Sequence, residues 1–202
     1  MIPEGYDIDS FTTSAKVVLV IEKESTFSKL LSLQSSNAGY DFLDSYILVT
    51  GKGYPDVSTR LLLKLLSHSL EIFCLIDGDP HGFQIYLTYK YGSKSMAFSS
   101  TSLAVPDIKF LGVAPSDWFS KLEIQTRDLI SLSNHDVKKC LSLLKNPHVY
   151  IDPSLKREIS RLMFTNYKSE IQSISTKKLQ TLVGRAIGDA SAEDTPRVQQ
   201  WM

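Results

Sequence analysis

Residues 16–22 (KVVLVIE), 46–50 (YILVT) and 71–76 (EIFCLI) decide the fold class of this chain. Each stretch is a nearly continuous run of apolar, often β-branched residues, which is typical of a strand buried on both faces of a parallel sheet. Helical spacing of apolar residues lies between and after these runs, at 26–33, 57–67 and 80–91, and a fourth strand is predicted at 108–113. Because parallel neighbours need helical crossovers, the sequence predicts an α/β fold with about four parallel strands flanked by helices.

The second half of the chain has a different pattern. Helical spacing of apolar residues recurs at 116–122, 134–144, 153–164 and 176–187. We therefore expect a lead-in at 1–15, a sheet domain at 16–115 and an α-rich extension at 116–187. Residues 188–202 have almost no large apolar side chain, which predicts a loose tail.

Composition excludes several classes of protein. The 202 residues include 22 basic and 22 acidic side chains, so net charge indicates no polyanionic partner and any contact with nucleic acid must be local. No run approaches the roughly 18 apolar residues of a membrane span, so we expect no membrane partner. Two cysteines without a CxxC pair argue against a zinc site or a disulfide framework. The acidic N-terminus lacks a secretory pattern, which favours a reducing compartment.

Three carboxylates follow the predicted strands. Glu22 ends the first strand, and Asp77 and Asp79 follow the third. Ligands of open parallel sheets bind beyond the carboxyl ends of the strands, so the three acids should meet at one edge. Like charges at close range require a cation between them, and Mg²⁺ is the natural candidate, because it takes a few carboxylates and reaches for phosphate oxygens. Gly78 and Gly82 would let a phosphate backbone approach closely.

Each acid also has a purely structural interpretation. Asp79 precedes Pro80 and could cap the third helix, Asp77 could be a turn residue, and Glu22 could be an exposed charge. For each residue alone we favour the structural role. For the three together, with the two glycines, we favour the metal site.

The loop at 51–56 (GKGYPD) offers a second possible site. It matches neither the Walker A motif nor the dinucleotide GxGxxG, whose third glycine is replaced by Asp56. The loop leads into a helix, with Lys52 and Arg60 available for an anion, although a tight turn with solvated charges explains it equally well. His81 could bind a phosphate or could be structural. GxSxG is absent, which disfavours hydrolase-triad chemistry.

These motifs, in this order, resemble one family over about residues 16–170. The chain resembles the A subunit of topoisomerase VI and its eukaryotic relative, the meiotic transesterase that makes DNA double-strand breaks. The matching stretches are VIEK at 20–23 with Phe27, ILVTGKGYPDVSTR at 47–60, LIDGDPHG at 75–82, YKYGS at 89–93, VP at 105–106, FLG at 110–112 and PSD at 115–117.

The resemblance implies a Toprim domain, which is a Rossmann-like fold, over residues 16–115. It implies that Glu22, Asp77 and Asp79 bind Mg²⁺, for which Mn²⁺ can substitute. Basic residues would then hold the DNA backbone: Lys23, Lys52, Arg60 and His81. In the family reaction a tyrosine attacks a backbone phosphate and leaves a 5'-phosphotyrosyl end, and the Toprim site serves the partner subunit's tyrosine. The implied partners are double-stranded DNA, a second copy and a B-type ATPase-like subunit or meiotic accessory proteins, in the nucleus.

The chain departs from the family pattern at its start. The nucleophilic tyrosine of the family lies in a winged-helix domain before the Toprim domain, whereas about 15 residues precede the first strand here. We assign that role to no residue, Tyr6 included, and expect this chain by itself not to cleave DNA. The resemblance weakens after Ile174. Two rival hypotheses remain: a metal-dependent Toprim nuclease or primase-like enzyme, and a non-catalytic, truncated interaction module.

Overall fold

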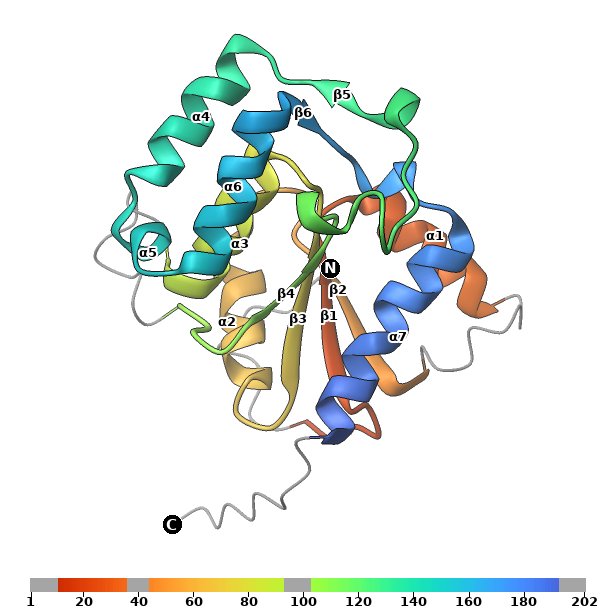
Figure 1. Ribbon diagram of the computed structural model, residues 1–202. Coiled ribbons are helices and arrows are strands. Elements are labelled where there is room, and N and C mark those ends of the chain that lie inside the picture. The colour runs from red at the N-terminus through yellow and green to blue at the C-terminus, as the bar shows by residue number, and fades with distance from the viewer. Residues whose placement is uncertain (1–10, 36–43, 93–102, 193–202) are drawn as a thin grey trace.

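The computed structural model describes residues 11–35, 44–92 and 103–192. Its centre is a sheet of four strands in the order β2-β1-β3-β4, and every neighbouring pair is parallel (Figure 1). The strands are β1 (Val17–Ile21), β2 (Tyr46–Thr50), β3 (Glu71–Ile76) and β4 (Lys109–Gly112). The α/β fold with a four-stranded parallel sheet is therefore confirmed.

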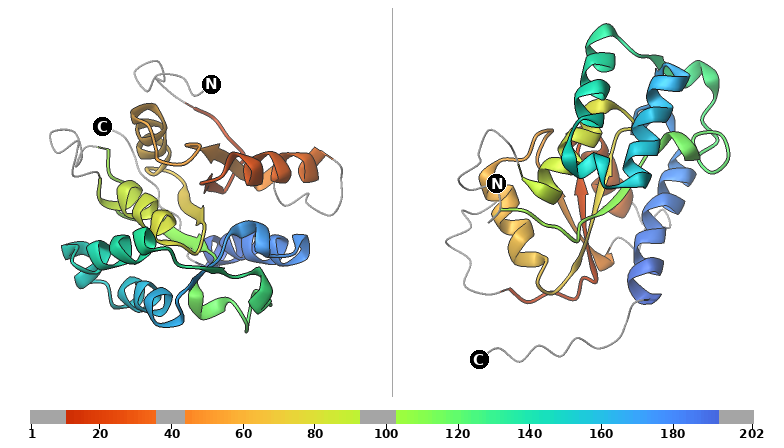
Figure 2. Two further views of the ribbon diagram at one scale, coloured as in Figure 1. Left: turned by 90° about the horizontal axis from the view of Figure 1, so that it is seen from above. Right: turned by 60° about the vertical axis from the view of Figure 1, so that its left-hand side comes forward.

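Helices cover both faces of the sheet. Helices α1 (Glu24–Ser35) and α7 (Thr176–Ala192) lie on one face, and α2 (Val57–Leu66) and α3 (Pro80–Tyr91) lie on the other, as the view along the strands shows (Figure 2). All five residues of β1 are completely buried. This explains the uninterrupted apolar run in the sequence, because a strand between two helical layers has no solvent face.

The extension packs beside α3 and then returns to the sheet. It contains α4 (Asn134–Leu144), α5 (Pro147–Tyr150) and α6 (Pro153–Thr165), and α4 contacts both α3 and α6. A two-stranded antiparallel ribbon joins β5 (Ile130–Ser131) to β6 (Tyr167–Lys168). Short 3-10 turns complete it: η3 (Pro115–Asp117), η4 (Thr126–Asp128) and η5 (Ile171–Ser173).

Buried side-chain hydrogen bonds help to join the sheet to this extension. The indole Nε1 of Trp118 donates to the carbonyl of Val113 at 3.1 Å, just beyond β4. The hydroxyl of Tyr46 in β2 donates to the carbonyl of Val183 in α7 at 2.5 Å. Because both bonds are buried, they hold the end of the chain against the sheet that the first half builds.

Three features of the second half differ from the expectations. The helix expected at 116–122 is only the 3-10 turn η3 followed by further turns. The ribbon β5–β6 has no counterpart in the prediction, because strands of two residues carry no periodicity. The loose tail expected from Gly188 is wrong in part, since α7 continues to Ala192. The rest of that tail, 193–202, lies outside the described residues, as do residues 1–10 of the lead-in. Within the described residues, no helix is long and apolar enough to span a membrane.

Candidate metal and DNA-backbone site

The carboxylate of Glu22 meets the backbone of Asp77 where β1 and β3 end. Because Ile21 pairs with Leu75 in the parallel register, the residues that follow these two strands come out side by side at the carboxyl edge of the sheet. The Oε2 atom of Glu22 accepts a hydrogen bond from the backbone N–H of Asp77 at 3.0 Å. The structure therefore brings Glu22 to Asp77, as the sequence predicts.

The carboxylate of Asp77 is buried and has a partner for each oxygen. Its Oδ1 accepts the backbone N–H of Ile171 at 2.8 Å, and its Oδ2 lies 3.0 Å from Lys23 Nζ. The same ammonium lies 3.1 Å from Glu170 Oε2. Asp77 is thus more than a turn residue, because it ties the edge of the sheet to the extension.

Asp79 has the structural role that the sequence allowed as an alternative. It is the N-cap of α3, and its Oδ1 accepts the backbone N–H of Gly82 at 2.7 Å. Its backbone is extended, and Pro80 follows in the first turn, where the missing N–H costs nothing. Capping uses one oxygen of Asp79 and leaves Oδ2 without a hydrogen bond from the described residues.

The glycines at this edge are explained by the chain itself rather than by an approaching phosphate. A Cβ on Gly78 would lie 2.0 Å from the carbonyl oxygen of Val113, and Gly78 forms an antiparallel bridge with Ser169. A Cβ on Gly82 would lie 2.5 Å from the carbonyl oxygen of Asp77. The expectation that these glycines leave room for DNA is therefore wrong, because the protein's own backbone fills that space.

Burial dominates the electrostatics of the acids. Burial, and next the charge of Asp77, raises the pKa of Glu22 from 4.5 to about 7. Burial also raises the pKa of Asp77, although the hydrogen bond from Ile171 and the ion pair with Lys23 oppose the shift. Burial therefore disfavours the ionised form of both acids, and an added cation would stabilise that form.

The donor set fits a hard cation in part. Glu22 Oε1 and Asp79 Oδ2 accept no hydrogen bond from the described residues, and oxygen donors are what Mg²⁺ prefers. Asp77 could contribute only if Lys23 moved away. Among the described residues, no three His, Cys, Asp or Glu side chains already stand in a metal-binding arrangement. The fit therefore rests on two available carboxylate oxygens and a third that Lys23 holds.

The four residues expected to hold DNA lie in different surroundings. Lys23 is paired with Asp77 and Glu170, as described above. Lys52 is exposed in the loop after β2, and its Nζ lies 2.8 Å from Glu24 Oε1. His81, in the first turn of α3, stacks on His135 of α4 with ring centroids 5.5 Å apart.

Arg60 differs from the other three because it is only 1% exposed. It belongs to the buried face of α2, together with Leu63 and Leu66. In this buried place Arg60 does not present its side chain at the surface, and its contact with DNA stays a prediction.

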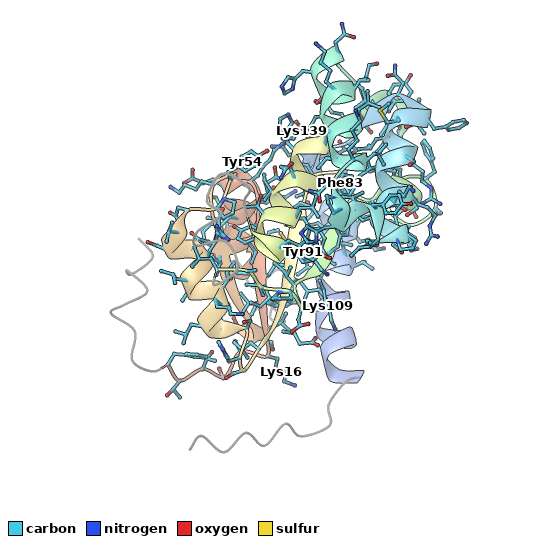
Figure 3. All side chains as sticks on the ribbon, turned by 90° about the vertical axis from the view of Figure 1, so that its left-hand side faces the viewer. Lys16, Tyr54, Phe83, Tyr91, Lys109 and Lys139 are labelled. Atoms are coloured by element: carbon cyan, nitrogen blue, oxygen red, sulfur yellow. The ribbon has the colours of Figure 1, made fainter. Side chains whose placement is uncertain are left out.

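Sequence analysis missed three groups at the site. Glu170 and the N–H of Ile171 come from the extension, far along the chain from Asp77, and no local pattern marks them. The third group is Tyr54, which lies at the carboxyl end of the sheet. Lys16 and Lys109 mark the opposite end (Figure 3). Burial, and then the negative charges of Asp79 and Glu22, raises the pKa of the Tyr54 hydroxyl. Its position in the glycine loop could have suggested this.

Known proteins have similar sequences. The model of the family described as the Toprim domain of the topoisomerase 6 A subunit and Spo11 matches residues 17–187. The chain is 40% identical to the mouse "Meiotic recombination protein SPO11" over 165 residues, which cover 81% of this chain and 40% of that protein. It is 40% identical to the human protein of the same name over 170 residues, which cover 83% of this chain and 42% of that protein.

A plant topoisomerase is also similar. The A subunit of DNA topoisomerase 6 from Arabidopsis thaliana is 33% identical over 184 residues, which cover 90% of this chain and 42% of that protein. The chain thus spans less than half the length of each of these three relatives.

Proposed function

Because the chain belongs to the Toprim-domain family of Spo11 and the topoisomerase 6 A subunit, we propose that it holds a divalent cation and DNA backbone in a protein that makes meiotic DNA double-strand breaks. The observation that carries the proposal is the meeting of Glu22 and Asp77 at the carboxyl edge of the sheet, with Asp79 at the start of α3. The cation would be Mg²⁺, with Mn²⁺ as a substitute.

The chain's own residues have distinct tasks in this proposal. Glu22 and Asp79 would hold the cation through Oε1 and Oδ2, while their other oxygens keep the backbone of residues 77–82 in place. A bound Mg²⁺ would supply positive charge to a phosphate oxygen and to the leaving oxygen of the sugar. The rigid strand ends fix the carboxylates beforehand, so that little reorganisation is needed when charge develops.

Lys52 and His81 would position the DNA backbone at the same edge. Lys52 is exposed and its partner Glu24 is exposed as well, so a phosphate can replace that pairing at little cost. Lysine contacts to phosphate add affinity without reading sequence and weaken with salt. Substitution of Lys52 by alanine should therefore weaken binding to all duplexes alike and reduce the salt slope of the affinity by about one.

We assign the remaining parts of the reaction to no residue of the sheet or the extension. The nucleophilic tyrosine would come from a winged-helix domain, a second copy would complete a dimer, and a B-type ATPase-like subunit or meiotic accessory proteins would drive the cycle in the nucleus. This chain alone would bind metal and DNA without cutting. Incubation with labelled duplex and Mn²⁺ should give neither a covalent protein–DNA adduct nor hydrolysed ends. An adduct contradicts the inactivity, and hydrolysed ends support a nuclease instead.

A non-catalytic interaction module is the second candidate. The ion pair between Lys23 and Asp77 favours it, because that lysine occupies one of the three carboxylates. Failure of the protein to bind Mn²⁺ at millimolar concentration would support this candidate.

Fluorescence anisotropy of a short duplex with a single-stranded overhang tests the proposal. Binding should be stronger with Mg²⁺ than with chelator, and the Glu22→Gln/Asp79→Asn variant should lose that difference. Both amides keep an oxygen for the N–H bonds of Asp77 and Gly82, so the fold is preserved. The control is Glu71→Gln/Asp107→Asn, which removes two charges near the other end of β3 and β4. Equal binding in all conditions would contradict a metal bridge to phosphate.

A further inference from the structure

Lys23 forms two ion pairs at the acidic edge of the sheet, and the proposed function gives them no role. Its Nζ lies between Asp77 Oδ2 at 3.0 Å and Glu170 Oε2 at 3.1 Å. The Lys23 side chain is 28% exposed, that of Asp77 is 3% exposed and that of Glu170 is 39% exposed. The ammonium therefore bridges a buried carboxylate of the sheet and a partly exposed carboxylate of the extension.

The two partners of Asp77 differ in how easily they can leave. The N–H of Ile171 is a backbone group, held in place by the two hydrogen bonds that pair Gly78 with Ser169. The Lys23 ammonium is carried on a flexible four-carbon stem and can swing aside. A metal ion that uses Asp77 must therefore replace Lys23 and leave Ile171 in place.

We propose that Lys23 is an internal counter-cation that competes with the divalent cation for Asp77, and that Glu170 keeps the ammonium once it is displaced. The inference rests on the metal site proposed above. It adds an order of events, in which the metal-free protein neutralises its buried carboxylate with its own lysine and exchanges that lysine for metal.

Glu170 is the group that would hold the Lys23 ammonium after it leaves Asp77. Glu170 belongs to the extension, whereas Lys23 follows closely after β1. A displaced ammonium that still has Glu170 within reach avoids the cost of losing both partners in a partly buried place. When metal binds, Lys23 would therefore lose its ion pair with Asp77 at the sheet edge and keep only its ion pair with Glu170 of the extension.

Mn²⁺ affinity, measured by the loss of the free-ion electron paramagnetic resonance signal, tests the competition without any activity assay. Lys23→Met removes the ammonium and should bind Mn²⁺ about tenfold more tightly than the wild type, since a neighbouring charge shifts such equilibria by about one to three decades. Lys109→Met is the matched control, because its ion pair with Glu71 at 2.9 Å lies at the other end of the strands. It should leave the affinity unchanged.

The role of Glu170 is tested in the wild type and in the Lys23→Met variant. Glu170→Gln should weaken Mn²⁺ binding several-fold when Lys23 is present and by less than about twofold in Lys23→Met, because coupled residues are non-additive. Equal weakening in both backgrounds would mean that Glu170 acts on the metal directly, which overturns its role as the receiving group.

Chemical labelling tests the exchange in the unaltered protein, so the inference stays testable even if Lys23→Met does not fold. Acetylation of Lys23 by an N-hydroxysuccinimide ester, followed by peptide mass spectrometry, should become several-fold faster when Mn²⁺ is added, while Lys109 stays constant. Unchanged labelling of Lys23 under conditions where Mn²⁺ binds overturns the inference and leaves the metal site standing. Absence of Mn²⁺ binding in both the wild type and Lys23→Met overturns the metal site, and the inference with it.

Discussion

Gly78 shows how closely the chain packs around the acidic edge. A Cβ at this position would meet the carbonyl oxygen of Val113 at 2.0 Å, and backbone on that side cannot shift without breaking the link from β3 to β4. Gly78→Ala should therefore lower the free energy of unfolding by about 3 kcal/mol or more, at the upper end of overpacking costs. Urea denaturation measures this.

Gly184 in α7 provides the control for Gly78. A Cβ there would meet nothing within 4 Å, and alanine is the better helix former. Gly184→Ala should raise the free energy of unfolding by about 0.5–1 kcal/mol. A similar loss of stability in both variants would contradict the close packing at Gly78.

Glu22 makes the stability of the metal-free protein depend on pH. Its pKa in the folded protein is about 7, above the ordinary value of 4.5, so between these values the folded state binds more protons than the unfolded state. Stability must then fall as pH rises through this window, by up to about 3 kcal/mol for this group. Urea midpoints from pH 5 to 8 should show the decline, and Glu22→Gln should flatten it. An equal slope in that variant would contradict the assignment to Glu22.

Helix α4 depends on its first turn. Asp136 completes a capping box with Ser133 and also lies 2.9 Å from Lys168 of β6. Burial would raise the pKa of Asp136, but the hydrogen bonds from Ser133 and Lys168 outweigh it and lower the pKa to about 2. This stabilisation is present above the ordinary pKa of 3.8 and is lost as pH falls toward 2.

Replacement of Asp136 tests this. Asp136→Ala should cost about 2–3 kcal/mol at neutral pH, because it removes the carboxylate half of the capping box and the ion pair with Lys168. Thermal unfolding at pH 7 measures the loss, and the exposed Asp107→Ala serves as the control with a change within about 0.5 kcal/mol. Equal melting temperatures for the two variants would show that the capping box is unimportant.

The elements of the sheet could be predicted from the sequence, and several of the extension could not. Strands β2 and β3 and helices α3 and α4 have the predicted bounds, because buried strands and capped helices have strong local patterns. The ribbon β5–β6 and the bridge from Gly78 to Ser169 depend on contacts between distant residues, as does the place of Glu170 in the site. The sequence pattern predicts an exposed Arg60, because charged residues on helices are usually exposed. The structure buries it instead.

At the scale of the whole molecule, sheet and extension should unfold as one unit. Trp118 is bonded to Val113, Asp77 is bonded to Ile171, and α7 lies against the sheet. In a Trp201→Phe background, the fluorescence of Trp118 reports the extension and far-ultraviolet circular dichroism reports all helices. The two urea transitions should coincide, as expected of a cooperative unit. Two separate midpoints would show that the extension is an independent domain.

The central claim is that the acidic edge of this sheet holds a divalent cation. The most direct test is a Mn²⁺ titration of the wild type and of Glu22→Gln/Asp79→Asn, without DNA, monitored by electron paramagnetic resonance. We predict that the wild type binds Mn²⁺ and that the double variant, folded as judged by circular dichroism, loses this binding. Equal Mn²⁺ binding by the two proteins would place the cation elsewhere and contradict the account.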